Sequence, residues 1–174
     1  MSFGTLASLI LAAAQPPAAG PFNAAAPENR EVLPSFSFAT VEPVLAQISA
    51  RFERAGNAEQ PALTVTFANG RHAAILFGSC QGTNCRAISI QAVWNAPAGS
   101  DAAQLAAAVA AFNHRYAFSR ALVAADGRPT LQRYLTADYG FVRGNLAVNL
   151  IVFAGQIDRF ASEVLRTRAP TPGS

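Results

Sequence analysis

Apolar side chains recur at helical spacing in three stretches of the chain, and each stretch predicts a helix with one buried face. The first helix is expected to begin with Thr40 as its N-cap and to end before Gly56. The second covers residues 101–116 after Ser100, and the third covers residues 142–165. The apolar stripes are Val41, Val44, Leu45, Ile48 and Phe52; Leu105, Val109, Phe112 and Tyr116; and Leu146, Leu150, Phe153, Ile157, Phe160 and Val164.

The stripe of the third helix has alternating spacings of four and three residues, like the seam of a coiled coil. Burial in the core of the domain is the more frequent use of such a stripe, and contact with a second copy of the chain is the alternative. Gly155 lies within this helix, where glycine costs roughly 1 kcal/mol relative to alanine. We therefore expect a close helix crossing at Gly155.

Apolar and polar residues alternate in residues 63–67, which predicts a strand with one buried and one exposed face, whereas residues 71–77 are apolar on both faces in their second half and are expected in the centre of the sheet. Asn69-Gly70 predicts a type I′ hairpin turn, and Asp126-Gly127 predicts a second tight turn. Residues 78–84, with a cysteine near each end, are expected to form a loop between two strands. The predicted strands are residues 63–67, 71–77, 86–94, 118–124 and 130–137.

The predicted order is therefore helix, three antiparallel strands, helix, two strands, helix (α-β-β-β-α-β-β-α). It indicates a single α+β domain at residues 40–166, in which three helices pack against a five-stranded antiparallel sheet. A chain of 174 residues is long enough for one such domain with a core of its own.

The two ends of the chain differ in composition from the predicted domain. Residues 1–14 contain an apolar run that is too short to span a bilayer, and Ala12 and Ala14 precede Gln15 as in a signal-peptide cleavage site. We expect export to the periplasm, with a cytoplasmic location as the alternative because no Lys or Arg precedes the run. Residues 15–39 are expected to be a flexible lead rich in proline and alanine, and residues 167–174 a disordered tail.

Composition and charge exclude several classes of protein. Hydrophobic residues make up 51% of the chain and charged residues only 13%, which excludes a disordered protein. No apolar run reaches the ~18 residues of a membrane-spanning helix, so no integral membrane segment is expected. The 13 basic residues exceed the 10 acidic ones by three and are scattered along the chain. A nucleic-acid-binding protein gathers such residues on one face, so we expect no nucleic-acid partner.

Cys80 and Cys85 are the two cysteines, with four residues between them. We favour a structural disulfide in an oxidising compartment, worth roughly 2 kcal/mol; free thiols, and a metal-binding or catalytic role, are the alternatives. Neither His72 nor His114 is spaced to form a metal site with these cysteines. The chain lacks the nucleophile-elbow, P-loop, dinucleotide-binding and zinc-protease motifs. The residues therefore give no positive case for an enzyme, a metal or a cofactor.

Three segments together resemble the YbjN domain family of bacteria. They are the run FGSCQGTNCRAISIQAVW, the run FNHRYAFSRALVAADGRPTLQRYL and the long apolar helix near the C-terminus. The matching residues are Cys80 and Cys85, Asn113 and Arg115 with Phe118, and Asp126-Gly127. This chain has Phe112 where members often carry tryptophan, and Tyr139-Gly140-Phe141 where they often have a glycine pair.

The resemblance implies a noncatalytic sensory transduction regulator with a fold similar to type III secretion chaperones. It also implies an unidentified protein partner, a dimer as one possibility, and no cofactor. Type III chaperones hold extended client segments on apolar patches, so by analogy of fold this chain is expected to be chaperone-like. The residues expected to form a partner surface are Trp94, Phe112, Asn113, Arg115 and Tyr116.

Three hypotheses for the function follow from these observations. The first is a protein-binding or regulatory module in the periplasm. The second is a small-ligand-binding domain with a pocket between the sheet and the last helix. The third is a hydrolase that uses Cys80 as a thiolate near His72 or His114. The first is the one that we favour.

Overall fold

The main sheet has six antiparallel strands, one more than predicted. The computed structural model describes residues 22–166. The strands are β2 (Arg51–Gly56), β3 (Pro61–Thr66), β4 (His72–Gln81), β5 (Asn84–Val93), β6 (Arg120–Val123) and β7 (Pro129–Thr136). They lie in the order β2-β3-β4-β5-β7-β6.

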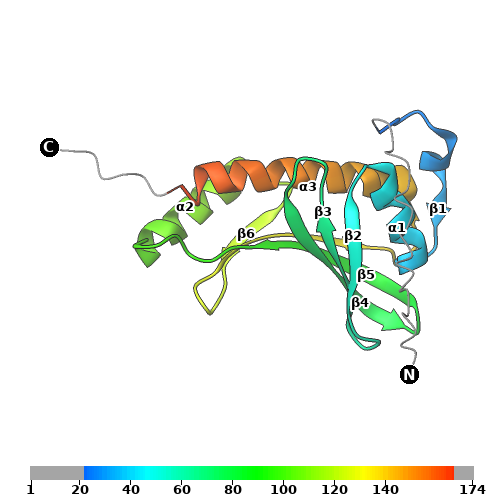
Figure 1. Cartoon of the computed structure of the whole chain (residues 1–174), viewed down its shortest axis with the longest axis horizontal. Helices are drawn as coiled ribbons and strands as arrows, with labels where there is room; N and C mark the ends of the chain where they lie inside the picture. Colours follow the sequence, from blue (N-terminus) through cyan, green and yellow to red (C-terminus); the bar gives the residue numbers. More distant parts are fainter. Residues whose placement is uncertain (1–21, 167–174) are drawn as a thin grey trace, which may run out of the picture.

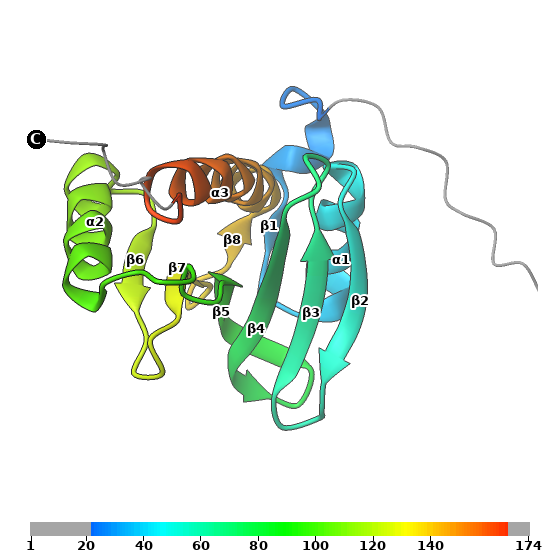
Figure 2. The ribbon, with the colours of Figure 1, turned by 60° about the vertical axis from the view of Figure 1, so that its left-hand side comes forward.

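The three predicted helices are present, and all lie on one side of the sheet (Figures 1 and 2). They are α1 (Phe38–Gln47), α2 (Ala102–Arg115) and α3 (Arg143–Glu163). A short 3-10 helix η1 (Pro27–Arg30) precedes them, and β1 (Val32–Leu33) pairs with β8 (Phe141–Val142) in a small second sheet. The predicted single α+β domain with three helices and an antiparallel sheet is thus confirmed.

The apolar stripe of α3 is buried within the chain itself. Leu150, Phe153 and Phe160 are fully buried between the helix and the sheet, so the prediction of a core stripe is confirmed. The close crossing expected at Gly155 is wrong, because a Cβ atom there would meet nothing within 4 Å. The close contact is at Gly144, where a Cβ atom would lie 2.7 Å from the carbonyl oxygen of Asn29.

The first helix ends earlier than predicted, and this accounts for the additional strand. Ser49 takes a left-handed φ of 59° just after α1. Its N–H bonds the carbonyl of Ala46, and the N–H of Ala50 bonds the carbonyl of Leu45 at 2.9 Å, which together form a Schellman motif. The motif reverses the chain, so Phe52 belongs to β2 instead of the helix. At the other end, Ser37 is the N-cap in place of Thr40.

Residues 15–39 are expected to be a flexible lead, but the part of this lead that the structure describes is packed against the domain. Phe36 is 1% exposed, and its backbone exchanges two hydrogen bonds with Cys85. Asn29 is also buried, and its side chain bonds Gln47 at 2.9 Å. These contacts place residues 27–39 in the folded domain. The predicted signal peptide (residues 1–14), the start of the lead and the predicted tail (residues 167–174) lie outside the described residues.

Both predicted hairpins are present, but the first turn differs in type. Gly70 has a φ of 77°, whereas Asn69 keeps a negative φ. The N–H of Gly70 bonds the carbonyl of Phe67, and the N–H of Phe67 bonds the carbonyl of Arg71. This is the pattern of a three-residue loop with a type I turn and a bulge at glycine, not of a type I′ turn.

The loop predicted over residues 78–84 is mostly strand. β4 and β5 continue to Gln81 and Asn84, which pair across a two-residue turn. Cys80 therefore lies directly opposite Cys85, and the structure joins their sulfurs in a disulfide. The bond ties the tip of this hairpin together.

Candidate functional site

Two of the residues expected to form a partner surface pack against α3. Phe112 is 2% exposed, and its ring meets Phe160 edge-on at 5.1 Å. Trp94 is half-buried and stacks on Phe160 at 4.9 Å. Phe112 therefore offers no surface to a partner in this structure. Its burial was visible in the sequence, because it belongs to the apolar stripe of α2.

The polar members of that set connect elements of the domain to one another. The side-chain amide of Asn113 accepts from the N–H and donates to the carbonyl of Ala121 on β6, both at 2.8 Å. The Arg115 guanidinium and the Tyr116 hydroxyl both bond the Glu163 carboxylate at the end of α3. These contacts give Asn113, Arg115 and Tyr116 a structural role, and their contact with a partner stays a prediction.

The residues considered for catalysis or metal binding are not assembled into a centre in the described part of the chain. The sulfur of Cys80 is bonded to Cys85, which leaves no thiol for the hydrolase hypothesis. His72 exchanges a hydrogen bond with Thr66 at 3.0 Å, and His114 is exposed on α2. Within residues 22–166, no three His, Cys, Asp or Glu side chains gather as metal ligands would.

A hollow of about 500 Å³ lies between the sheet and the start of α3, where β7 contributes Leu135 and Thr136 and the helix contributes Asn145, Leu146 and Asn149. Along the rest of α3, core side chains such as Phe153, Ile157 and Phe160 fill the space between the helix and the sheet. The binding of a small ligand in this hollow stays a prediction. Two larger concave surfaces lie elsewhere in the described part of the chain. One lies on the face of the sheet opposite the helices, and the other lies at the N-terminal end of α1.

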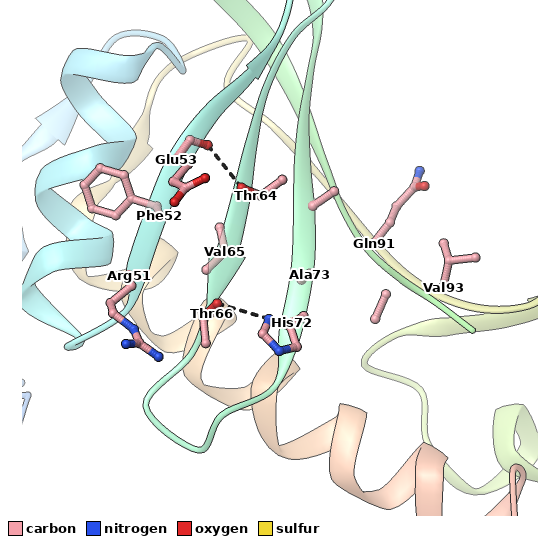
Figure 3. Close-up of a pocket in the computed structure, with 12 residues that line it drawn as sticks. Arg51, Phe52, Glu53, Thr64, Val65, Thr66, His72, Ala73, Gln91 and Val93 are labelled. Atoms are coloured by element: carbon pink, nitrogen blue, oxygen red, sulfur yellow. Dashed lines mark hydrogen bonds between the residues drawn. The ribbon is translucent and has the colours of Figure 1, made fainter. Parts of the chain in front are cut away.

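Apart from Arg86 near the start of β5, the face of the sheet opposite the helices, called the open face here, carries no charged side chain on its four central strands. Figure 3 shows part of it, a hollow of about 620 Å³ across β2, β3, β4 and β5. The neutral outward positions of the four central strands that are exposed or half-buried are Thr64, Thr66, His72, Ala74, Leu76, Gly78, Ser89, Gln91, Val93, Gln132, Tyr134 and Thr136.

Hydrogen bonds among neutral groups organise this face. The Ser89 hydroxyl accepts from the side-chain amides of Gln91 at 2.9 Å and Gln132 at 2.8 Å. Larger apolar groups stand among these small side chains, with Tyr134 59% and Leu76 40% exposed. Solvent-exposed sheet faces are polar, as this one is, and the centres of protein interfaces are depleted of charged residues, as this face also is.

The second concave surface, called the α1 groove here, has a volume of about 770 Å³. It lies where the sheet extends past the N-terminal end of α1 (Figure 2). The rings of Phe38 and Phe77 meet edge-on at 5.2 Å in its wall. The other lining residues are Ser37, Ala39, Arg54, Ala55, Gly56, Asn57, Ala58, Pro61, Gly82, Thr83 and Cys85.

One ion pair fixes the polar side of the α1 groove. The Arg54 guanidinium bonds both carboxylate oxygens of Glu42, at 2.6 and 3.0 Å, and lies over the Phe38 ring at 4.6 Å. The hydrogen bond to Glu42 raises the pKa of Arg54, which as an arginine is cationic at every physiological pH in any case. The groove thus has an apolar floor and a charged rim.

Sequence reasoning missed both surfaces. The neutral outward positions can be read in the sequence, but only once the register and the uncovered face are known. The α1 groove combines residues from α1 and from the strands β2, β3, β4 and β5, so no local motif marks it. No helix among residues 22–166 has the length and hydrophobicity that crossing a bilayer requires.

A family of known proteins matches this chain over most of its length. No curated protein matches the chain. The model of the YbjN family, described as "putative bacterial sensory transduction regulator", matches residues 37–166, which run from the N-cap of α1 to just past the end of α3. The match covers most of the chain and confirms the resemblance seen in its sequence. The chain therefore belongs to the YbjN family.

Proposed function

We propose that this YbjN-family domain is a noncatalytic regulatory module that binds a protein partner through the α1 groove. One observation carries the proposal: Phe38, Phe77 and Pro61 form an apolar hollow that no other described segment covers. An apolar centre with a polar rim is the usual anatomy of a protein-binding surface. The rim here is the Arg54–Glu42 ion pair together with Asn57 and Thr83.

The partner that fits the groove is an extended segment with one or two large apolar side chains. The hollow is short and lies between a helix end and two hairpin tips, so it accepts side chains better than a flat surface does. Such a partner would agree with a chaperone-like use of the fold, in which client segments are held on apolar patches. The charged rim would then contact the polar residues on either side of the inserted side chain.

Site-specific photo-cross-linking in cells tests the proposal. A photoreactive residue replaces Ala39, which is exposed in the α1 groove, or Ala106, which is exposed on α2. We expect a defined adduct with one protein from position 39 and none from position 106. Equal adducts from both positions, or none from position 39, would contradict the proposed site.

A small apolar ligand is the second candidate occupant. The volume of about 770 Å³ falls within the range of small-molecule pockets. Native mass spectrometry of protein purified without detergent distinguishes the two, because a retained ligand adds a discrete mass. A retained ligand that is displaced by Ala39→Arg would favour this second function over the first.

We place this function in the periplasm as part of the same proposal. A disulfide between Cys80 and Cys85 fits an oxidising compartment, and the apolar run in residues 1–14 fits a signal peptide. Mass spectrometry of the protein from its native cells should give a mature start near Gln15. A chain that retains Met1 in the cytoplasmic fraction would reject the location.

A further inference from the structure

Two unpaired charges mark the ends of one row of residues across the open face. The register of the strands places Glu53, Thr64, Ala74, Gln91, Gln132 and Arg120 side by side, in that order, from edge strand β2 to edge strand β6. Glu53 and Arg120 are exposed, and neither belongs to an ion pair in the described part of the chain. Five strand spacings of about 4.8 Å hold them ~24 Å apart, so they cannot pair within one chain.

From this arrangement we propose that the open face binds a second copy of the chain, sheet against sheet, in a two-fold symmetric dimer. The axis runs parallel to the strands, between β4 and β5. A rotation about it places β2 of one copy over β6 of the other. Glu53 of each copy then faces Arg120 of the other, and the dimer forms this ion pair twice.

The same rotation matches large side chains with small ones. Two rows of the open face are centred on the axis, and in each row a bulky residue faces a small one of the second copy. The facing pairs are Tyr134 with Ala62, Leu76 with Ser89, Gln91 with Ala74, and Gln132 with Thr64. The most exposed of these, Tyr134, would lie over β3, one of the two strands in the middle of the hollow shown in Figure 3.

The other two-fold axis in the plane of the sheet lacks this match. An axis along the row would place Glu53 over Glu53 and Arg120 over Arg120 of the second copy. It would also place Gln91 of one copy over Gln91 of the other. Long side chains of the two copies would then meet each other, and gaps would remain where small side chains face small ones. Like charges that face each other disfavour association, so the axis parallel to the strands is the better one.

The area of the open face is sufficient for a specific dimer. Six strands about 4.8 Å apart, with about six residues of ~3.3 Å each along a strand, give a face of roughly 600 Å² per copy. The two copies together would bury roughly 1,200 Å², the lower limit for a specific interface. We therefore expect an equilibrium between monomer and dimer that depends on concentration.

Charge reversal tests both the surface and its orientation. Sedimentation of the full chain over a concentration series gives the dimer dissociation constant of the wild type, Glu53→Arg, Arg120→Glu and the variant with both changes. Each single reversal should weaken the dimer about tenfold, because it makes two repulsive pairs, and the double variant should return to within about threefold of the wild type. Glu59→Arg, on an exposed loop beside β2, is the matched control and should change little.

Either of two results would overturn this orientation: a wild-type chain that stays monomeric, or a double variant that is as weak as the single ones. Thr64→Arg adds a test of the surface itself, since it places a charge near the centre of the open face and should abolish the dimer. A dimer that survives Thr64→Arg would use another surface, such as the exposed stripe Val148, Ile151 and Val152 on α3, and would refute the proposal.

The dimer does not depend on the function proposed for the α1 groove. The groove lies on the helix side of the sheet, whereas the open face is on the opposite side. Ala39→Arg should therefore leave the dimer dissociation constant unchanged, and the charge reversals should leave cross-linking from position 39 unchanged. A change in both assays from one substitution would contradict the separation of the two surfaces.

Discussion

The ring of Phe160 on α3 packs against both α2 and the residue that follows β5. Its removal should destabilise the domain severely. Phe160 is fully buried; its ring stacks on Trp94 at 4.9 Å and meets Phe112 at 5.1 Å. Truncation of a buried Phe to Ala costs about 3–5 kcal/mol, and each aromatic pair adds about 0.5–1.5 kcal/mol beyond its buried area. We therefore expect Phe160→Ala to lower the free energy of unfolding by about 4–5 kcal/mol.

Urea unfolding measures this loss. Trp94 is the single tryptophan of the chain and touches Phe160, so its fluorescence reports on the site, and far-ultraviolet circular dichroism reports on the whole domain. With an m-value of about 2 kcal/mol/M, the unfolding midpoint should fall by about 2 M. Val148→Ala, on the exposed side of the same helix, should change stability by less than about 0.5 kcal/mol. A loss below about 2 kcal/mol for Phe160→Ala would refute the packing described for this ring.

Three further substitutions test other contacts. Asn113→Asp keeps the acceptor but loses the donor to the β6 carbonyl, so it should cost about 1–2 kcal/mol in urea unfolding; an unchanged midpoint would count against that bond. Gly144→Ala should destabilise through a clash, whereas Gly155→Ala in open space should stabilise by about 0.5–1 kcal/mol, and equal effects would contradict both assignments. Nonreducing peptide mapping should link Cys80 to Cys85, and two alkylatable thiols in native protein would exclude the bond.

Much of the fold could be predicted because its signals are local. The stripe of α3 repeats over many turns, so its burial follows from spacing alone, and Phe153 and Phe160 are buried as expected. The two glycine turns fix the hairpins whatever their turn type, since each glycine takes a positive φ. These features depend on neighbours in the sequence and need no tertiary contact.

The missed elements depend on contacts that the sequence does not mark. The end of α1 is set by Ser49 in a left-handed conformation, where glycine is the residue that usually signals such an end. Without that signal, Phe52 continues the helical spacing, and the sequence predicts helix where the structure has β2. The ordered segment around Phe36 is likewise held by pairing with Cys85, far away in the sequence.

The candidate site was predicted less well than the fold. Phe112, Asn113 and Tyr116 stand close together in the sequence, but the structure uses them to join α2 to α3 and β6. The open face is marked by the absence of charge from the middle of its central strands. That absence appears only when the uncovered face and the register are known.

The affinity of the partner identified by cross-linking decides whether the α1 groove is the binding site. Titration calorimetry of that partner against the wild type, Ala39→Arg and Ala106→Arg compares a change inside the α1 groove with one outside it. Ala39→Arg should weaken binding at least about tenfold, while Ala106→Arg should leave it within about twofold. Equal affinity for all three proteins would contradict the assignment of the groove as the binding site.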